Sequence, residues 1–189
     1  ALIKDDINED YISSSKALAI TGTHLSHKDT REAVLTALSF ATKHGLKRIL
    51  DIDFRPVLWG LTDLGDGETR FIASKHVTSE LQEVLNHFDL IVGTEEEFHI
   101  AGGNTDTLKA LKNVRKFSNA ILVCKRGALG CSVFKDEIPN HLVEGLTITG
   151  VKVEVLNVLG AGDAFMSGFL RGYLSGESLE ESCKYANAC

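Results

Sequence analysis

No run of apolar residues in this 189-residue sequence approaches the roughly 18 that a membrane-spanning helix needs, so no membrane partner is predicted. The sequence has no basic excess either: 20 Lys and Arg stand against 26 Asp and Glu, which gives a formal net charge of −6 and argues against nucleic-acid binding. The compositional bias of disordered or collagen-like chains is also absent, because 43% of the residues are hydrophobic and 24% are charged. The sequence therefore predicts one globular domain or a piece of one.

The four cysteines form no C-x-x-C pair, which argues against a zinc site. Their low number suits a reducing compartment, and no signal peptide precedes the first charged residues, so a cytoplasmic location is expected. The sequence does not begin with Met, and it stops at Cys189 within a predicted helix. We therefore expect a fragment of a longer chain.

Short apolar segments alternate with helical patterns along most of the sequence. Strands separated by helices of about 10–15 residues indicate βαβ units and an α/β fold with a mostly parallel sheet. In such a sheet, ligands bind where the carboxyl ends of the strands lead into helices. Residues 131–134 are expected to pair in antiparallel fashion with the strand before them. The expected strands are 17–20, 48–54, 90–92, 120–124, 131–134 and 151–156, and the expected helices begin near residues 29, 78, 94, 105, 162 and 179.

A glycine-rich turn before the helix expected at residue 162 points most directly to chemistry. Gly160, Ala161 and Gly162 have almost no side chain, so unpaired N–H groups and the helix dipole would form a site for an anion such as phosphate. Asp163 would lie beside that site, where it could take a proton from a hydroxyl that attacks phosphorus. From the spacing alone, a helix N-terminus stabilised by an acidic residue explains the pattern equally well.

Four segments together resemble the ribokinase-like, or PfkB, family of sugar kinases. They are Asp51–Trp59, Thr94–Glu97, Leu122–Gly130 and Gly160–Phe169, which match the family's D-x-N-x-R-P-x-L-W segment, its N-x-x-E motif, its nucleotide-side turn and its C-terminal signature. The variant residues Asp53 and Asn157 are most similar to those of kinases that phosphorylate 5-dehydro-2-deoxygluconate in inositol catabolism. The resemblance implies a ribokinase-like three-layer α/β/α fold, in which residues 1–189 form the C-terminal part of a single kinase domain.

The resemblance also implies which residues transfer the phosphoryl group. Asp163 would be the catalytic base, and the amides of Gly160, Ala161 and Gly162 would form the anion hole. Glu97 would help to organise Mg²⁺ and its waters, since hard cations prefer oxygen ligands. A solvated first helical turn, where acidic residues are favoured, is the alternative explanation of Glu97.

The nucleotide would bind along the turn that follows the fourth expected strand. By the resemblance, the residues that bind ATP are Lys125, Gly127, Gly130 and Asn187. Related kinases hold a monovalent cation with an aspartate at the position of Asn157, so a potassium site is left open.

Arg55 determines the expectation about the second substrate. A guanidinium can bind a carboxylate through two parallel hydrogen bonds, and in similar sugar-acid kinases the matching arginine faces the carboxylate of the substrate. The implied partners are therefore ATP and a small sugar acid. An ion pair of Arg55 with Asp51 or Asp53 is the alternative explanation of the same residue.

Three functions stay open at this point. The first is an ATP-dependent sugar-acid kinase, and the second is another ribokinase-like kinase, for 2-keto-3-deoxygluconate, fructose or a nucleoside. The third is a non-catalytic nucleotide-binding domain that retains the fold. The fragment alone is expected to be poorly active, and a homo-oligomer is left open for the full-length protein.

Overall fold

One six-stranded sheet organises the computed structural model, which describes residues 2–63, 71–154 and 157–189. The strands lie in the order β1-β2-β3-β4-β5-β6, with β1 to β4 parallel and β5 and β6 each antiparallel to the strand before it. The predicted α/β class and the antiparallel pairing of β5 are thus confirmed. The bounds are β1 (Ala17–Thr21), β2 (Lys47–Asp51), β3 (Leu90–Thr94), β4 (Ile121–Lys125), β5 (Cys131–Phe134) and β6 (Leu146–Ile148).

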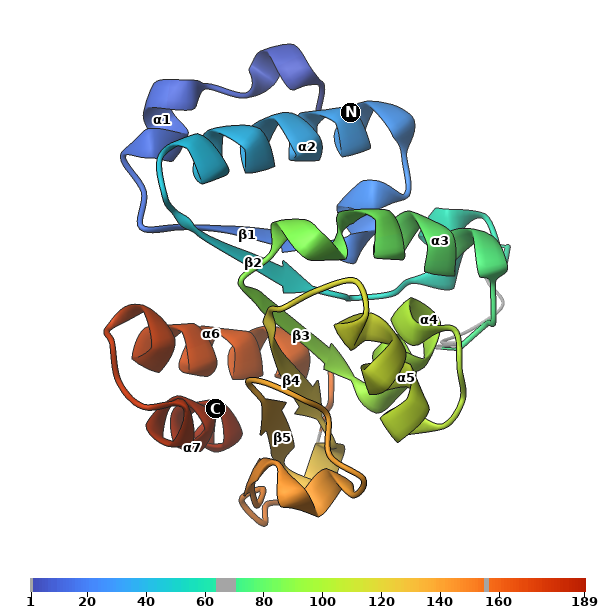
Figure 1. Ribbon diagram of the computed structural model, residues 1–189, viewed down its shortest axis with the longest axis vertical. Coiled ribbons are helices and arrows are strands. Elements are labelled where there is room, and N and C mark those ends of the chain that lie inside the picture. Colours follow the sequence, from blue (N-terminus) through green and yellow to red (C-terminus); the bar gives the residue numbers. More distant parts are fainter. Residues whose placement is uncertain (1, 64–70, 155–156) are drawn as a thin grey trace.

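Helices cover both faces of this sheet and complete three layers. Helices α2 to α5 lie on one face, with α1 beside α2, whereas α6 and α7 lie on the other face (Figure 1). No helix in the described residues is long and apolar enough to cross a membrane. The bounds are α1 (Glu9–Ser13), α2 (Lys28–Lys43), α3 (Lys75–Val84), α4 (Glu95–Gly102), α5 (Thr107–Arg115), α6 (Ala161–Leu174) and α7 (Leu179–Ala188).

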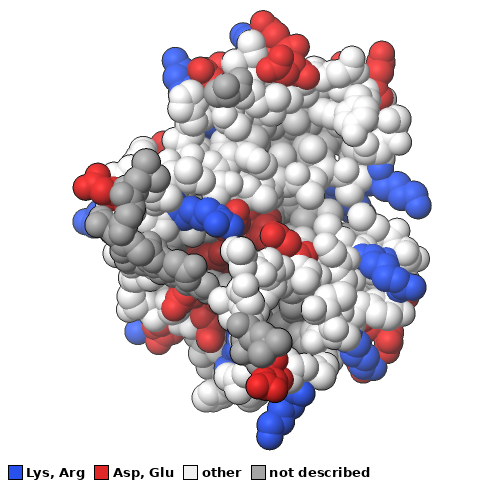
Figure 2. All heavy atoms as spheres, turned by 180° about the vertical axis from the view of Figure 1, so that it is seen from behind, with Lys and Arg blue, Asp and Glu red and all other residues white. Residues whose placement is uncertain are grey.

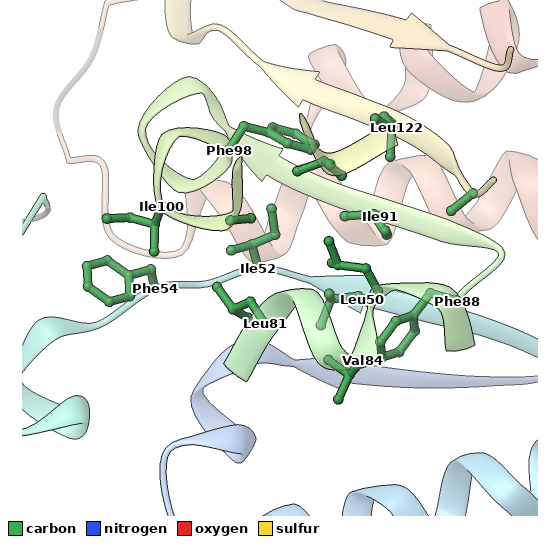
Figure 3. Packing of buried hydrophobic residues seen from close by; sticks show 14 of the residues in the cluster. Leu50, Ile52, Phe54, Leu81, Val84, Phe88, Ile91, Phe98, Ile100 and Leu122 are labelled. Carbon is green, nitrogen blue, oxygen red and sulfur yellow. The ribbon is translucent and has the colours of Figure 1, made fainter. Parts of the chain in front are cut away.

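The core is divided by the sheet because successive strand residues point to opposite faces. Leu50 and Ile91 pack toward α3 and α4, in the cluster drawn in Figure 3. Their neighbours Ile49 and Val92 pack toward α6 and α7, together with Phe169. All five are buried, and burying such a side chain contributes about 1.5–3 kcal/mol. Burial on both faces explains why the parallel strands appear in the sequence as nearly continuous apolar runs.

Two glycines let α6 approach α7 closely. A Cβ on Gly168 would lie 2.7 Å from the carbonyl oxygen of Tyr185, and one on Gly172 would lie 2.6 Å from Oγ of Ser182. The two helices therefore pack with almost no side chain between them at these points. This contact fixes the direction in which the first turn of α6 points.

The strand expected at residues 151–156 is not present as predicted. Residues 151–154 belong to no helix or strand, and residues 155–156 lie outside the described residues. The last strand is instead β6, which pairs with β5 and occupies its outer edge. The alternation at 151–154 resembles that of a half-buried strand, but Val151 and Val153 are 58% and 67% exposed. With the edge of β5 already occupied, these valines do not reach the core.

Candidate active site

Functional side chains meet at the carboxyl edge of the sheet, because parallel strands end there side by side. Asp51 is the last residue of β2 and Lys125 the last of β4. Lys125 Nζ lies 3.2 Å from Oδ1 of Asp51 and 3.9 Å from Oε2 of Glu97. The side chains of Lys125 and Asp51 are only 12% and 11% exposed. The ion pair is therefore largely removed from water. Its contribution to stability consequently depends more on its geometry than that of a surface pair does.

Glu97 is held in this group by the way α4 begins. The Thr94 N–H donates to Oε2 of Glu97 at 2.6 Å, and the Glu97 N–H donates to Oγ1 of Thr94 at 3.2 Å. This reciprocal pair is a capping box, which satisfies two backbone N–H groups at the helix start. Thr94 stands where the resembling family has asparagine, and both residue types cap helices well. The cap fixes the Glu97 carboxylate on the side that faces Lys125.

The carboxyl edge has an excess of negative charge. Burial raises the pKa of Asp51 to about 6, Lys125 opposes this rise, and the nearby carboxylates of Glu97 and Asp53 add to it. Acidic side chains gather in a hollow near the middle of the face shown in Figure 2. From the sequence, Asp51 is named only as a possible partner of Arg55. Its position at the end of a predicted buried strand could have placed it at the carboxyl edge as well.

Asp51 should make the stability of the folded chain depend on pH. Its pKa of about 6 lies above the ordinary value of 3.8, so between these values the folded state binds a proton that the unfolded chain releases. The free energy of unfolding should therefore fall as pH rises from about 4 to 6 and then level off, by about 2–3 kcal/mol for this group. Urea titrations of wild type and Asp51→Asn across this range test it. If the free energy of unfolding depended on pH in the same way in both proteins, this assignment to Asp51 would be contradicted.

The glycine turn opens toward the solvent at the start of α6. Gly160 precedes the helix with φ +81°, a left-handed conformation that glycine adopts without strain. The Ala161 N–H donates to the carbonyl of Val158 at 3.2 Å, whereas the N–H groups of Gly160, Gly162 and Asp163 have no acceptor among the described residues. Asp163 is exposed in the first helical turn. The unpaired donors of the turn therefore include Gly160, Gly162 and Asp163, beside the exposed carboxylate of Asp163.

Lys125 lies between the glycine turn and the carboxylates of Asp51 and Glu97. A Cβ on Gly162 would lie 3.6 Å from Lys125 Nζ, so the ammonium group and the first turn of α6 are in contact range. An anion placed at this turn would meet two independent sources of positive potential, the lysine charge and the helix N-terminus. Lys125 thus lies within reach of Asp51, Glu97 and Gly162, and Asp163 follows Gly162 in the first turn of α6.

Of the other residues expected to bind ATP, Gly130 and Asn187 contact the end of β6. Gly127 begins the short 3-10 turn after β4 and Gly130 follows it, and a Cβ on Gly130 would collide with the carbonyl of Ile148. Asn187 donates from Nδ2 to the carbonyls of Ile148 and Thr149, at 3.1 and 3.2 Å. Both Gly130 and Asn187 thus lie against the backbone at the end of β6, whereas Gly127 has open space around it.

Arg55 lies on the same edge, in the segment that follows β2. Its Nε donates to Oδ1 of Asp53 at 3.1 Å, so the ion pair considered as the alternative explanation is present. The Arg55 side chain is nevertheless 58% exposed. Arg55 therefore remains accessible to a ligand.

The carboxylates of Asp51 and Glu97 are suitable ligands for a hard cation. Asp51 and Glu97 offer carboxylate oxygens, which Mg²⁺ prefers, and this ion commonly needs only one or two carboxylates besides waters and substrate phosphates. Within the described ranges, no three His, Cys, Asp or Glu side chains lie close enough together to hold a metal ion by themselves. The residues thus fit a cation that arrives with a nucleotide better than a permanent metal centre.

Comparison with known proteins finds matches along nearly the whole chain. The profile of the pfkB family carbohydrate kinases matches residues 2–189. A 5-dehydro-2-deoxygluconokinase of Listeria monocytogenes serotype 4a is 34% identical over 99% of this chain and 53% of its own length. The enzyme of the same name from Bacillus subtilis (strain 168) is 30% identical over 97% of this chain and 52% of its own length. The chain thus spans about half the length of these curated relatives.

Solved structures of other proteins have the same fold as this chain. A putative ribokinase II from E. coli, in complex with ATP and Mg²⁺, aligns with a TM-score of 0.79 at 20% identity, over 100% of this chain and 55% of that one. A fructokinase from Vibrio cholerae O395, bound to fructose, ADP and calcium, gives a TM-score of 0.79 at 20% identity, over 100% of this chain and 56% of that one. Since the family profile covers nearly every residue, the chain belongs to the pfkB family of carbohydrate kinases.

Proposed function

We propose that this chain carries the phosphoryl-transfer site of an ATP-dependent kinase that phosphorylates a hydroxyl of 5-dehydro-2-deoxygluconate. The observation that carries the proposal is the meeting of Lys125 with the open first turn of α6, directly beside the exposed carboxylate of Asp163. Relatives of this name at 30–34% identity support the choice of substrate. Since the chain spans about half of their length, the proposal concerns the complete gene product.

The proposed roles follow from the charges at the site. The N–H groups of Gly160, Gly162 and Asp163 would donate hydrogen bonds to the oxygens of the transferred phosphoryl group, and Lys125 would neutralise the negative charge that develops on them. The Asp163 carboxylate would take the proton of the attacking hydroxyl. The Ala161 amide, already bonded to Val158, would contribute mainly by keeping the turn in shape.

The cofactors of the proposal are ATP and Mg²⁺. Glu97 and Asp51 are the residues that would hold the cation, directly or through its waters, and the cation would neutralise phosphate charge. Asn157 accepts a hydrogen bond from the Leu159 N–H at 2.8 Å and has no charge to offer a monovalent cation. No monovalent cation is therefore part of the proposal.

Arg55 provides the test of the substrate class. In the complete gene product, Arg55→Lys should raise the KM for 5-dehydro-2-deoxygluconate about tenfold, because lysine cannot form two parallel hydrogen bonds to a carboxylate. The KM for an uncharged sugar such as fructose should change little. An assay that couples ADP formation to NADH oxidation measures both values.

Arg171→Lys is the matched control, since Arg171 is also an exposed arginine paired with a carboxylate, that of Glu177 at 3.3 Å. Equal losses for charged and uncharged sugars in Arg55→Lys would contradict the sugar-acid assignment. A preference for fructose in the wild type would replace the sugar-acid assignment, whereas a preference for 2-keto-3-deoxygluconate, which is itself a sugar acid, would replace only the assigned substrate.

A further inference from the structure

The segment after β2 contains a charge pair whose geometry is unusual. We propose that Asp53 is a positioning residue that holds Arg55 by its Nε, so that the terminal nitrogens Nη1 and Nη2 face the carboxylate of the substrate. The inference rests on the proposed function, because it needs a substrate that carries a carboxylate. It assigns Asp53 a part in selecting that substrate.

The backbone turns sharply at Asp53. Its φ is +33°, which makes it the one non-glycine residue with a positive φ in the described ranges. Among side-chain-bearing residues, Asn and Asp tolerate this region best. Ile52 and Phe54 on either side are 1% and 7% exposed and pack into the core, as Figure 3 shows. The Ile52 N–H also donates to the carbonyl of Val92 at 2.9 Å. The core therefore anchors the segment on both sides of a turn that leaves Asp53 and Arg55 outside it.

The pairing uses one edge of the guanidinium group and leaves another. Arg55 Nε donates to Oδ1 of Asp53 at 3.1 Å, and the described residues offer no acceptor to Nη1 or Nη2. The end edge formed by these two nitrogens can bind a second carboxylate through two parallel hydrogen bonds. Because the two carboxylates would occupy different edges of one cation, Asp53 does not compete with the substrate for the same donors.

The benefit of this pair should appear in substrate binding rather than in folding. An ion pair with an arginine that is 58% exposed contributes little to stability. A free arginine, however, loses rotamer freedom when it binds a ligand, and that loss weakens the complex. Asp53 restricts Arg55 before the substrate arrives, so less freedom is lost on binding.

The test compares Asp53→Asn, Arg55→Lys and the double variant in the complete gene product. Asparagine accepts the left-handed backbone and removes only the charge. Asp53→Asn should raise the KM for 5-dehydro-2-deoxygluconate about 3- to 10-fold, with the KM for ATP and the melting temperature unchanged. In the Arg55→Lys background, the same substitution should have almost no further effect, because Asp53 acts through Arg55.

Asp53→Gly, which also permits a positive φ, should repeat the KM change if the asparagine variant fails to fold. An unchanged or lowered KM in Asp53→Asn, or an equal effect in the Arg55→Lys background, would overturn the inference while leaving the kinase intact. A wild-type protein that phosphorylates no sugar acid would overturn the proposed function and this inference together.

Discussion

Replacing Asp163 by asparagine is expected to reduce phosphoryl transfer by about 10²–10⁴-fold, the usual contribution of a general base. Asparagine has nearly the same shape but cannot take the proton of the attacking hydroxyl. Asp163 is exposed and makes no side-chain contact among the described residues that would be lost, so the fold should be unchanged. The kcat with saturating ATP and sugar acid is the quantity to measure, with ADP binding determined separately by calorimetry.

A matched control separates catalysis from the helix dipole. Glu180 is likewise an exposed acidic residue in the first turn of a helix, α7, but lies outside the glycine turn. Glu180→Gln should leave kcat nearly unchanged. If Asp163→Asn retained wild-type turnover, the carboxylate would be a helix-stabilising residue only, and the phosphoryl-transfer proposal would lose its base.

Replacing Lys125 by methionine is expected to lower kcat/KM for ATP by about 10²-fold, comparable to the loss of one charge-stabilising donor at an active site. Methionine fills similar space but leaves the first turn of α6 as the remaining source of positive potential beside Gly162. The loss should be specific to the nucleotide. Steady-state kinetics with ATP as the varied substrate measure it, and retention of the wild-type value would argue against a phosphate at this turn.

The variant also removes the partner of a largely buried carboxylate, so folding needs its own control. Removing one member of such a pair destabilises more than removing both. Asp51→Asn combined with Lys125→Met should therefore recover the melting temperature lost in Lys125→Met, without recovering kcat/KM. Lys184→Met, which breaks a pair with Glu181 whose side chains are 49% and 46% exposed, should alter neither quantity.

Much of the fold was predictable because the sheet is buried on both faces. The apolar runs at β1 to β5 and the helical periods between them follow directly from that burial. The prediction of a strand at 151–156 was wrong because alternating apolar residues show which side chains a strand could bury, but not whether a neighbouring strand is available. Whether Val151 finds a partner depends on the edge of β5, which β6 occupies.

The site was predictable only in part, for a similar reason. Gly162 and Asp163 are adjacent in the sequence, so their chemistry is visible as a local pattern. The ion pair of Asp51 with Lys125 joins residues 74 positions apart, and it forms because β2 and β4 end at the same edge of the sheet. No spacing rule within a single sequence reveals such a pair. The alternatives left open for Arg55 were Asp51 and Asp53, and the structure pairs it with Asp53.

Because α6 packs closely on α7, substitutions on α7 can affect the glycine turn at the start of α6. Since glycine leaves no compressible side chain at residues 168 and 172, α6 cannot tilt unless α7 follows. Residue 172 lies about 16 Å along the helix axis from Ala161, at 1.5 Å per residue. A bulkier residue at Ser182 would press on Gly172, and a small angular change there would become a larger displacement at the amide groups. A substitution on α7 would thus displace the N–H groups of the glycine turn and the proposed base, Asp163, without contacting either.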